Sequence, residues 1–253
     1  MKTFNEVIKI SNFENNLKND AITFRLNKVC KLFSKYNSNF DRVLDIGCGS
    51  GDTSLFLKNM LNIKEIYGVD INKKYIELAQ CRGVKALYLN ISEDNFPFGE
   101  NYFDAIFAGE VIEHLYDPDK FLDEAYRVLK IGGCLIITTP NLAAWYNRIA
   151  LLFGFQPFWM DASLRYPNVG KLKKVGTENG EHIRVFTSIA LADMLKLHRF
   201  DIIRIEYSLP PIISKGLPHY FYLIERIMSE LKMSSDLIVV SKKLDSHVGK
   251  LGT

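Results

Sequence analysis

Hydrophobic positions along the chain change their period repeatedly between residues 21 and 140. Apolar residues recur at helical spacing over 21–36, and a short β-branched run follows at 42–46. The same alternation continues with strands predicted at 65–69, 84–89, 103–108 and 134–138, the last after a turn at Gly132-Gly133. Helices are predicted between them at 53–61, 73–81 and 119–129. Strands that alternate with helices of about ten residues are typical of βαβ units around a parallel sheet. The pattern therefore predicts an α/β fold.

The pattern loosens after Pro140 and becomes regular again near residue 188. Residues 141–153 are aromatic-rich with helical spacing, and 154–181 predict a loop or lid. Further elements are predicted as a helix at 188–197, a strand at 202–207, a helix at 220–231 and a strand at 237–241. We therefore expect an N-terminal helical extension over 1–40 and one main domain over 41–253. Within that domain, 141–181 would form the lid and 209–235 a helical insert.

Composition excludes several classes of protein. The 253 residues are 47% hydrophobic and 24% charged with a net charge of +3, which excludes a disordered chain and gives no general argument for a nucleic-acid partner. The four cysteines form no CxxC pair, so zinc-ribbon and thioredoxin-type sites are not predicted. The first residues lack the apolar core of a secretion signal, and no run of 18 apolar residues occurs. We expect a cytoplasmic protein without a transmembrane segment, as a monomer or homodimer.

The strongest motif is the segment VLDIGCGSG, in which Gly47, Gly49 and Gly51 follow a predicted strand and open a helix. Glycines allow a ligand to approach the backbone closely, and a helix N-terminus presents free N–H groups. Asp70 ends the next strand, where a carboxylate can accept both ribose hydroxyls of a nucleoside.

The acids around this turn indicate which nucleoside it binds. A dinucleotide fingerprint has a third glycine where this chain has Asp52, and an acid facing a pyrophosphate is unfavourable. Asp45, just before the turn, also suits a cationic ligand better than a phosphate. The pattern favours a positively charged nucleoside over NAD, so an NAD-dependent oxidoreductase is the disfavoured alternative.

Several blocks in order resemble class I S-adenosylmethionine (SAM)-dependent methyltransferases: VLDIGCGSG, YGVDINKKYIELA, NFPFGENYFDAIFAGEVIEHLYDP and LKIGGCLIITTPN, with a fainter continuation over 182–202. The resemblance implies a Rossmann-like, doubly wound, seven-stranded sheet that is mostly parallel, with an antiparallel last strand and helices on both faces. It also implies SAM as cofactor. Its methionine end would be lined by Asp45, Gly47, Cys48, Gly49 and Gly51, and Glu110 would lie at the amino end of SAM. Asp70 would hold the ribose, and Ile71 would pack on the adenine. Asn90 and Ile91 would lie where the family commonly has an acid near the adenine amino group.

The segments GEVIEHL and TTPN resemble two narrower groups, the O-methyltransferases of ubiquinone biosynthesis and the small-RNA 2′-O-methyltransferases. Both carry E-x-x-E-H and can use a divalent metal there. In this chain Glu110, Glu113 and His114 would share one face of a helical turn, and His182 could complete a set suited to Mg²⁺ or Mn²⁺. The RNA group has a further histidine where this chain has Arg184, which weakens the RNA interpretation.

The function predicted is SAM-dependent methyl transfer, with O-methylation of a small-molecule, lipid or glycan acceptor. His114, His182 and Glu113 are the candidate catalytic residues, either as a base or with a metal, although Glu113 and His114 could instead cap a helix. An RNA 2′-O-methyltransferase and a non-catalytic SAM-binding module remain alternatives. The aromatic lid suits a lipid-like or aromatic acceptor, whereas a phosphate, glycan or RNA is suited by the basic residues Arg165, Lys171, Lys173, Lys174 and Arg184.

Overall fold

The computed structural model describes residues 21–36, 40–166, 168–172, 182–208 and 219–245. Three predicted segments lie partly outside these residues. They are the first half of the N-terminal extension, the part of the lid with Lys173 and Lys174, and the start of the insert. None of the described helices is long and apolar enough to cross a membrane.

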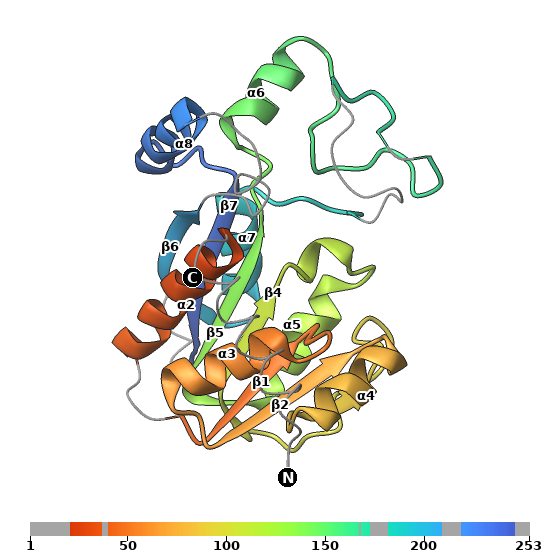
Figure 1. The fold of residues 1–253 in the computed structure, drawn as a ribbon, viewed down its shortest axis with the longest axis vertical. Helices are drawn as coiled ribbons and strands as arrows, with labels where there is room; N and C mark the ends of the chain where they lie inside the picture. Colours follow the sequence, from red (N-terminus) through yellow and green to blue (C-terminus); the bar gives the residue numbers. More distant parts are fainter. Residues whose placement is uncertain (1–20, 37–39, 167, 173–181, 209–218, 246–253) are drawn as a thin grey trace, which may run out of the picture.

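The described strands form one seven-stranded sheet in the order β3-β2-β1-β4-β5-β7-β6 (Figure 1). Strand β7 runs antiparallel to both of its neighbours, β5 and β6, while β1 to β5 pair in parallel. The mostly parallel sheet with an antiparallel last strand is thereby confirmed. The strands are β1 (Arg42–Ile46), β2 (Glu65–Asp70), β3 (Lys85–Tyr88), β4 (Phe103–Gly109), β5 (Leu129–Pro140), β6 (Phe200–Ser208) and β7 (Asp236–Lys243).

Helices cover both faces of the sheet because successive strand residues point to opposite sides. On β1, Val43 packs with the apolar residues of α2, α3 and α4, whereas Leu44 packs with those of α5 and α7. The described helices are α2 (Ala21–Tyr36), α3 (Asp52–Leu61), α4 (Lys73–Cys81), the 3₁₀ turn η1 (Ile112–His114), α5 (Pro118–Val128), α6 (Trp145–Leu152), α7 (Ser188–Leu197) and α8 (His219–Glu230).

The Gly132-Gly133 pair was expected to form a turn before a strand at 134–138, and that prediction is wrong. Strand β5 begins at Leu129 and runs through the glycines, which lie in a bulge. Opposite them, the pairing with β4 shifts register between Phe103 and Ala105. A Cβ atom on Gly133 would lie 2.7 Å from the Lys130 carbonyl oxygen and 3.0 Å from that of Asp104, so the bulged backbone leaves no room for a side chain.

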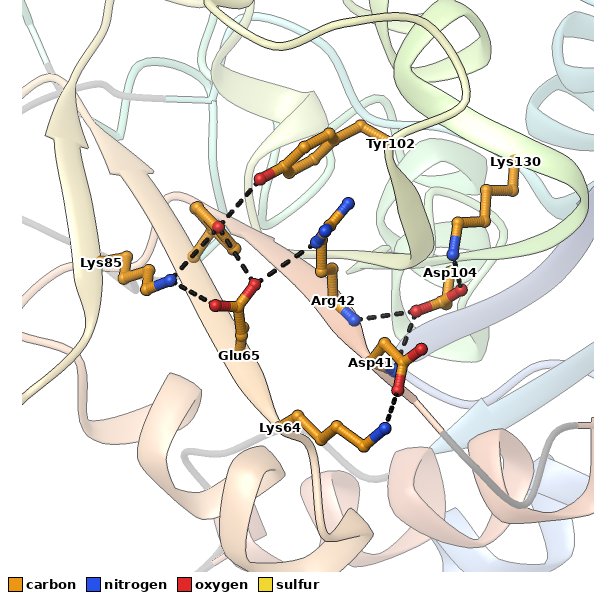
Figure 2. Close-up of polar contacts among 9 residues, drawn as sticks. Asp41, Arg42, Lys64, Glu65, Lys85, Tyr102, Asp104 and Lys130 are labelled. Carbon is orange, nitrogen blue, oxygen red and sulfur yellow. Dashed lines mark hydrogen bonds and ion pairs between the residues drawn. The ribbon is translucent and has the colours of Figure 1, made fainter.

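Charged side chains at the amino ends of the parallel strands bind one another (Figure 2). Glu65, which begins β2, contacts both Arg42 of β1 and Lys85 of β3. Asp104 in β4 accepts the backbone N–H of Arg42 and pairs with Lys130. Such exposed pairs contribute about 1 kcal/mol or less each. This charged edge lies opposite the carboxyl ends of the strands, where parallel sheets bind their ligands.

Candidate active site

The glycine turn after β1 is held tightly on one side and open on the other. The N–H groups of Gly47 and Cys48 both donate to the Val69 carbonyl, at 2.8 and 3.1 Å. Gly47 has φ +69°, and a Cβ there would lie 2.5 Å from Val111 Cγ2. Gly49 has φ +51°, but a Cβ on it would meet nothing within 4 Å. Gly49 therefore lines a free space that a ligand can enter up to the backbone.

Asp70 connects this turn to the end of β2. Its carboxylate accepts the Gly49 N–H at 2.9 Å through one oxygen and the Asn72 N–H at 2.8 Å through the other. Asn72 in turn caps α4, since its side-chain oxygen accepts two N–H groups of the first helical turn. Ile71 between them is 61% exposed. The carboxylate and an accessible apolar side chain thus lie side by side at the end of β2.

Asn90 and Ile91 follow β3 and belong to a compact turn. The Asn90 side-chain oxygen accepts the Ser92 N–H at 3.2 Å, and the Asn90 N–H donates to Asp94 at 3.0 Å. Ile91 is partly buried against the core. The side-chain oxygen of Asn90 is therefore already used as an acceptor within the turn.

Asp45 lies buried beneath the glycine turn. Its carboxyl group accepts the Ser54 hydroxyl of α3 at 2.5 Å. Burial raises the pKa of Asp45 to about 7, with the Ser54 bond acting in the opposite direction and Asp70 adding to the rise. In this structure the carboxyl group fastens α3 to the end of β1, and it is enclosed by protein.

Glu110 follows β4 in a left-handed backbone conformation, with φ +58°. Its carboxylate accepts the Thr138 hydroxyl at 2.9 Å and pairs with Arg25 of α2 at 3.0 Å. Arg25 also binds Asp236 at the start of β7, at 3.2 Å. A non-glycine residue in this conformation costs free energy, and such strain concentrates at functional sites.

The structure brings together Glu113, His114 and His182 but leaves Glu110 outside the group. Each of the three offers one ligand atom, and these atoms lie within 4.8 Å of one another. Glu110 does not join this group in the described residues, because η1 is a 3₁₀ turn that begins only at Ile112 and helical i, i+3 spacing does not extend back to Glu110.

Glu113 is fully buried and incompletely bonded. The Thr139 hydroxyl donates to its Oε2 at 2.9 Å, while Oε1 has no hydrogen-bond partner among the described residues. Burial, together with the negative charge of Glu110, raises the pKa of Glu113 well above its ordinary value. The Glu113 carbonyl accepts the N–H groups of Ile183 and Arg184, which holds the segment around His182 against η1.

His182 has a defined tautomer. Its Nδ1 lies 2.8 Å from the Trp159 carbonyl oxygen, and a carbonyl can only accept, so Nδ1 carries the proton. Burial and the nearby His114 lower the pKa of His182, which keeps the ring neutral near pH 7. Nε2 then holds the free lone pair. The two imidazole rings meet edge to face with centroids 4.7 Å apart.

The described residues of the expected lid form hydrogen bonds close to this histidine pair. The Trp159 indole N–H donates to the Tyr146 hydroxyl at 2.9 Å, and Trp145 of α6 donates to Glu225 of α8 at 2.7 Å. Glu225 is buried and also accepts the hydroxyls of Ser234 and Ser235. These bonds fix the start of α6 to α8 and to the chain before β7.

The basic residues expected to form one cluster are divided in the described part of the chain. Lys171 is buried and paired with Asp161 at 2.6 Å. The Arg184 guanidinium donates to the carbonyls of Leu115 and Tyr116 after η1. Arg165 is exposed beside Tyr166. Lys171 and Arg184 thus have structural partners.

Arg25 is one of the residues around the site that were not predicted from the sequence. It lies at helical spacing among the apolar residues Leu26, Val29 and Leu32 of α2, on the face that packs against the sheet. A cation at such a position signals a buried acidic partner, because an unpaired buried charge is costly. The partners, Glu110 and Asp236, are too distant in sequence to be identified from the pattern.

Comparisons with known proteins agree with this geometry. A methyltransferase-domain family model matches residues 44–137. The ubiquinone/menaquinone biosynthesis C-methyltransferase UbiE of Neisseria meningitidis is 30% identical over 190 residues, covering 72% of this chain and 71% of that protein. UbiE of Nitrosospira multiformis is 31% identical over 130 residues, which cover 48% of this chain and only 53% of that protein.

A solved structure shows the same fold. The SAM-dependent methyltransferase of Thermotoga maritima described as a possible histamine N-methyltransferase superposes with a TM-score of 0.59 at 19% identity, covering 92% of this chain and 95% of that one. With the glycine turn, Asp70 and the strand order in place, the chain belongs to the class I SAM-dependent methyltransferase family.

Proposed function

We propose that this protein transfers a methyl group from SAM to an acceptor whose oxygen is deprotonated at His182. The observation that carries the cofactor assignment is the open side of Gly49 next to the Asp70 carboxylate. Val111 packs on Gly47, and η1 with His114 follows it directly. This contact supports a site in which the histidine pair and the glycine turn act on the same ligand.

The residues present fit SAM. Asp70 would accept the ribose hydroxyls, the exposed Ile71 would cover the adenine, and the open backbone at Gly49 would face the methionine portion. The family resemblance would place further residues around these positions: Asp45, Cys48, Gly51, Asn90, Ile91 and Glu110. When bound, the sulfonium of SAM supplies an electrophilic methyl carbon, so the protein's own task is to orient and deprotonate the acceptor.

His182 suits the role of base. Its neutral ring, with Nδ1–H bonded to the Trp159 carbonyl, leaves the lone pair of Nε2 to take a proton from the acceptor hydroxyl. With its proton on His182, the acceptor oxygen would be the nucleophile toward the methyl group that bound SAM would supply, and S-adenosylhomocysteine would be the leaving group. His114 and Glu113, beside His182, would orient the ring and receive or pass on the proton.

A phenolic or quinol-like small molecule is the acceptor class that we propose. The Trp159 ring lies beside the His182 ring, with centroids 6.0 Å apart, and the Trp159 indole N–H donates to the Tyr146 hydroxyl. Deprotonation of a phenol also makes the ring carbons next to the C–O bond nucleophilic. The same base can therefore prepare the acceptor for methylation at oxygen or at carbon. O-methylation is the first expectation. C-methylation is the second candidate, because the UbiE relatives are named C-methyltransferases.

The His182→Asn variant tests the base directly. The Asn amide N–H can still donate to the Trp159 carbonyl, but the variant has no Nε2. We expect kcat to fall by about 10²–10⁴ while SAM affinity stays unchanged. The wild-type rate should rise with pH as His182 loses its proton, at a pH below the ordinary histidine pKa. The pH–rate profile of the variant should lack this rise. His198→Gln, at the α5–α7 contact, is the matched control.

Product analysis distinguishes the remaining alternatives. Nuclear magnetic resonance of the methylated phenol identifies a methyl ether or a C-methyl group. Wild-type kcat in His182→Asn would refute the base assignment. Binding of SAM without transfer to phenols, glycans or RNA would favour the non-catalytic module, and transfer to RNA alone would favour the RNA 2′-O-methyltransferase.

A divalent metal is the competing explanation for the same three residues. Glu113 Oε1, unpartnered among the described residues, together with His114 and His182 could hold Mg²⁺ or Mn²⁺, which would polarise the acceptor oxygen. Loss of activity in EDTA and its recovery with Mg²⁺ would replace the base mechanism with a metal-assisted one. Under the base mechanism, EDTA has no effect.

A further inference from the structure

The loop after α6 contains an ion pair whose two side chains are almost completely enclosed. Lys171 Nζ lies 2.6 Å from Asp161 Oδ1, and the exposed fractions of the two side chains are only 4% and 11%. The residue that follows each of them, Ala162 and Leu172, is exposed. Taking an ammonium group out of water is costly, and lysines are seldom buried unless they are paired. A loop does not need a buried charge in order to pack, so the pair indicates a specific role.

Backbone contacts fix the position of Lys171. The chain after α6 folds back on itself, and Gln156 forms a bridge with Lys171 (Figure 1). The Gln156 N–H donates to the Gly170 carbonyl at 2.9 Å, and the Phe155 N–H donates to the Ala150 carbonyl of α6 at 2.8 Å. Lys171 is therefore attached to the end of α6 through the backbone, which limits where its ammonium group can lie.

Asp161 connects this ion pair to the backbone of His182. Its Oδ2 accepts the His182 N–H at 3.4 Å, and its own N–H donates to the His182 carbonyl at 3.3 Å. The other carboxylate oxygen, Oδ1, is the one that contacts Lys171. Hydrogen bonds of this length lie beyond the usual range, so a small displacement of Asp161 would break them. The position of Asp161, and with it the contact to His182, depends on the ammonium group that holds the carboxylate.

The same short segment also orients the His182 ring. The Trp159 carbonyl, two residues before Asp161, accepts the Nδ1–H of the ring at 2.8 Å. The Trp159 indole N–H donates to the Tyr146 hydroxyl, which ties the start of the segment to α6. The end of the segment is tied at Asp161 to Lys171. The carbonyl that orients the imidazole thus lies between two anchors, α6 and Lys171.

We propose that Lys171 is a positioning residue for the His182 ring: through Asp161 it fixes the segment whose carbonyl holds Nδ1. The backbone just after His182 is attached to η1. That attachment leaves the ring free to rotate about its side-chain bonds, and the bond to the Trp159 carbonyl removes this freedom. The inference rests on the proposed function, in which Nε2 of the oriented ring takes the proton of the acceptor.

Nitrogen nuclear magnetic resonance of labelled histidine in the full chain tests the orientation of the ring without relying on activity. Above the ordinary histidine pKa, wild-type His182 should show the tautomer with its proton on Nδ1, and His182→Asn assigns the signal by its loss. Lys171→Met removes the ammonium group and should give a mixture of tautomers. Lys171→Arg can still pair with Asp161 and should keep the wild-type signal. Lys196→Met is the matched control, because it removes an exposed lysine that pairs with Asp193 in α7.

Methyl-transfer kinetics give a second readout. In Lys171→Met, kcat should fall about 10- to 100-fold while the acceptor KM and the SAM affinity stay unchanged, because a misplaced base weakens the transition state alone. Asp161→Asn breaks the same contact from the other side and should act similarly. The double variant should lose no more than the worse single variant, since both substitutions remove one interaction. Circular dichroism checks folding, and Asp161→Asn carries the comparison if Lys171→Met does not fold.

Three outcomes would overturn the proposal: the wild-type tautomer signal in both Lys171→Met and Asp161→Asn, a double variant whose losses add, or a loss of activity that Lys196→Met shares. The resonance signal separates this proposal from the proposed function. If the wild type transfers no methyl group while Lys171→Met alters the ring signal, the proposed function fails and the positioning of His182 by Lys171 stands.

Discussion

Asp45 provides a quantitative test of the electrostatics beneath the glycine turn. Its enclosed carboxyl group titrates near pH 7 in the folded protein, against an ordinary value of 3.8, and burial is the main cause. Between these two values the folded state holds a proton that the unfolded state has released. Raising the pH through this window therefore destabilises the wild type, and the loss levels off above pH 7.

The Asp45→Asn variant removes this titration while keeping an oxygen that can accept the Ser54 hydroxyl. Each pKa unit corresponds to about 1.4 kcal/mol, so the variant should gain roughly 2–3 kcal/mol relative to the wild type between pH 5 and pH 8. Urea unfolding at both pH values measures the difference in the free energy of unfolding. Asp201→Asn, which removes an exposed carboxylate of β6, is the control.

A difference between Asp45→Asn and the wild type that stays constant from pH 5 to pH 8 would refute this reasoning. So would a variant that loses stability relative to the wild type as the pH rises. Either result would mean that the carboxyl group is not enclosed in the folded protein, and that α3 is attached to β1 in another way.

Two further predictions concern the frame of the site. Gly47→Ala should destabilise the folded protein by about 2–4 kcal/mol, because its Cβ would meet Val111 in a left-handed backbone. Gly99→Ala, which has open space and no such backbone, should change the melting temperature little. Equal melting temperatures of the two variants would contradict the account. Arg25→Ala should lower the free energy of unfolding in urea by about 3–5 kcal/mol, because it leaves Glu110 and Asp236 without their shared cation. Arg148→Ala, at an exposed site, is the control. A loss in Arg25→Ala no larger than that in Arg148→Ala would show that this network adds no stability.

Local signals explain why most of the sheet and its helices could be predicted from the sequence. The helices at 73–81 and 188–197 begin and end as predicted, since Asn72 and Thr187 cap their first turns. The glycine pair at 132–133 misled the prediction because a bulge and a turn use the same residue type. Only the register shift in the pairing of β4 with β5 distinguishes the two, and that pairing is a contact between separate segments of the chain.

The candidate site was predictable where a motif or the family resemblance marks its residues. The glycine turn and Asp70 follow from motif spacing, and His182 joins His114 as expected. Glu110 departs from the prediction because its left-handed backbone turns it toward Arg25. Arg25, Asp236 and Glu225 were not identified because their roles depend on helices packing across the sheet, which no local pattern specifies.

Titration of SAM by calorimetry tests the central claim, that the glycine turn is a SAM site. Gly49 and Gly83 both have positive φ and open space for a Cβ, so alanine should strain both backbones by about 1–2 kcal/mol. Only Gly49 borders the proposed site. We predict that the wild type and Gly83→Ala bind SAM equally and that Gly49→Ala binds at least about tenfold more weakly. No binding by the wild type, or equal binding by Gly49→Ala, would contradict the account.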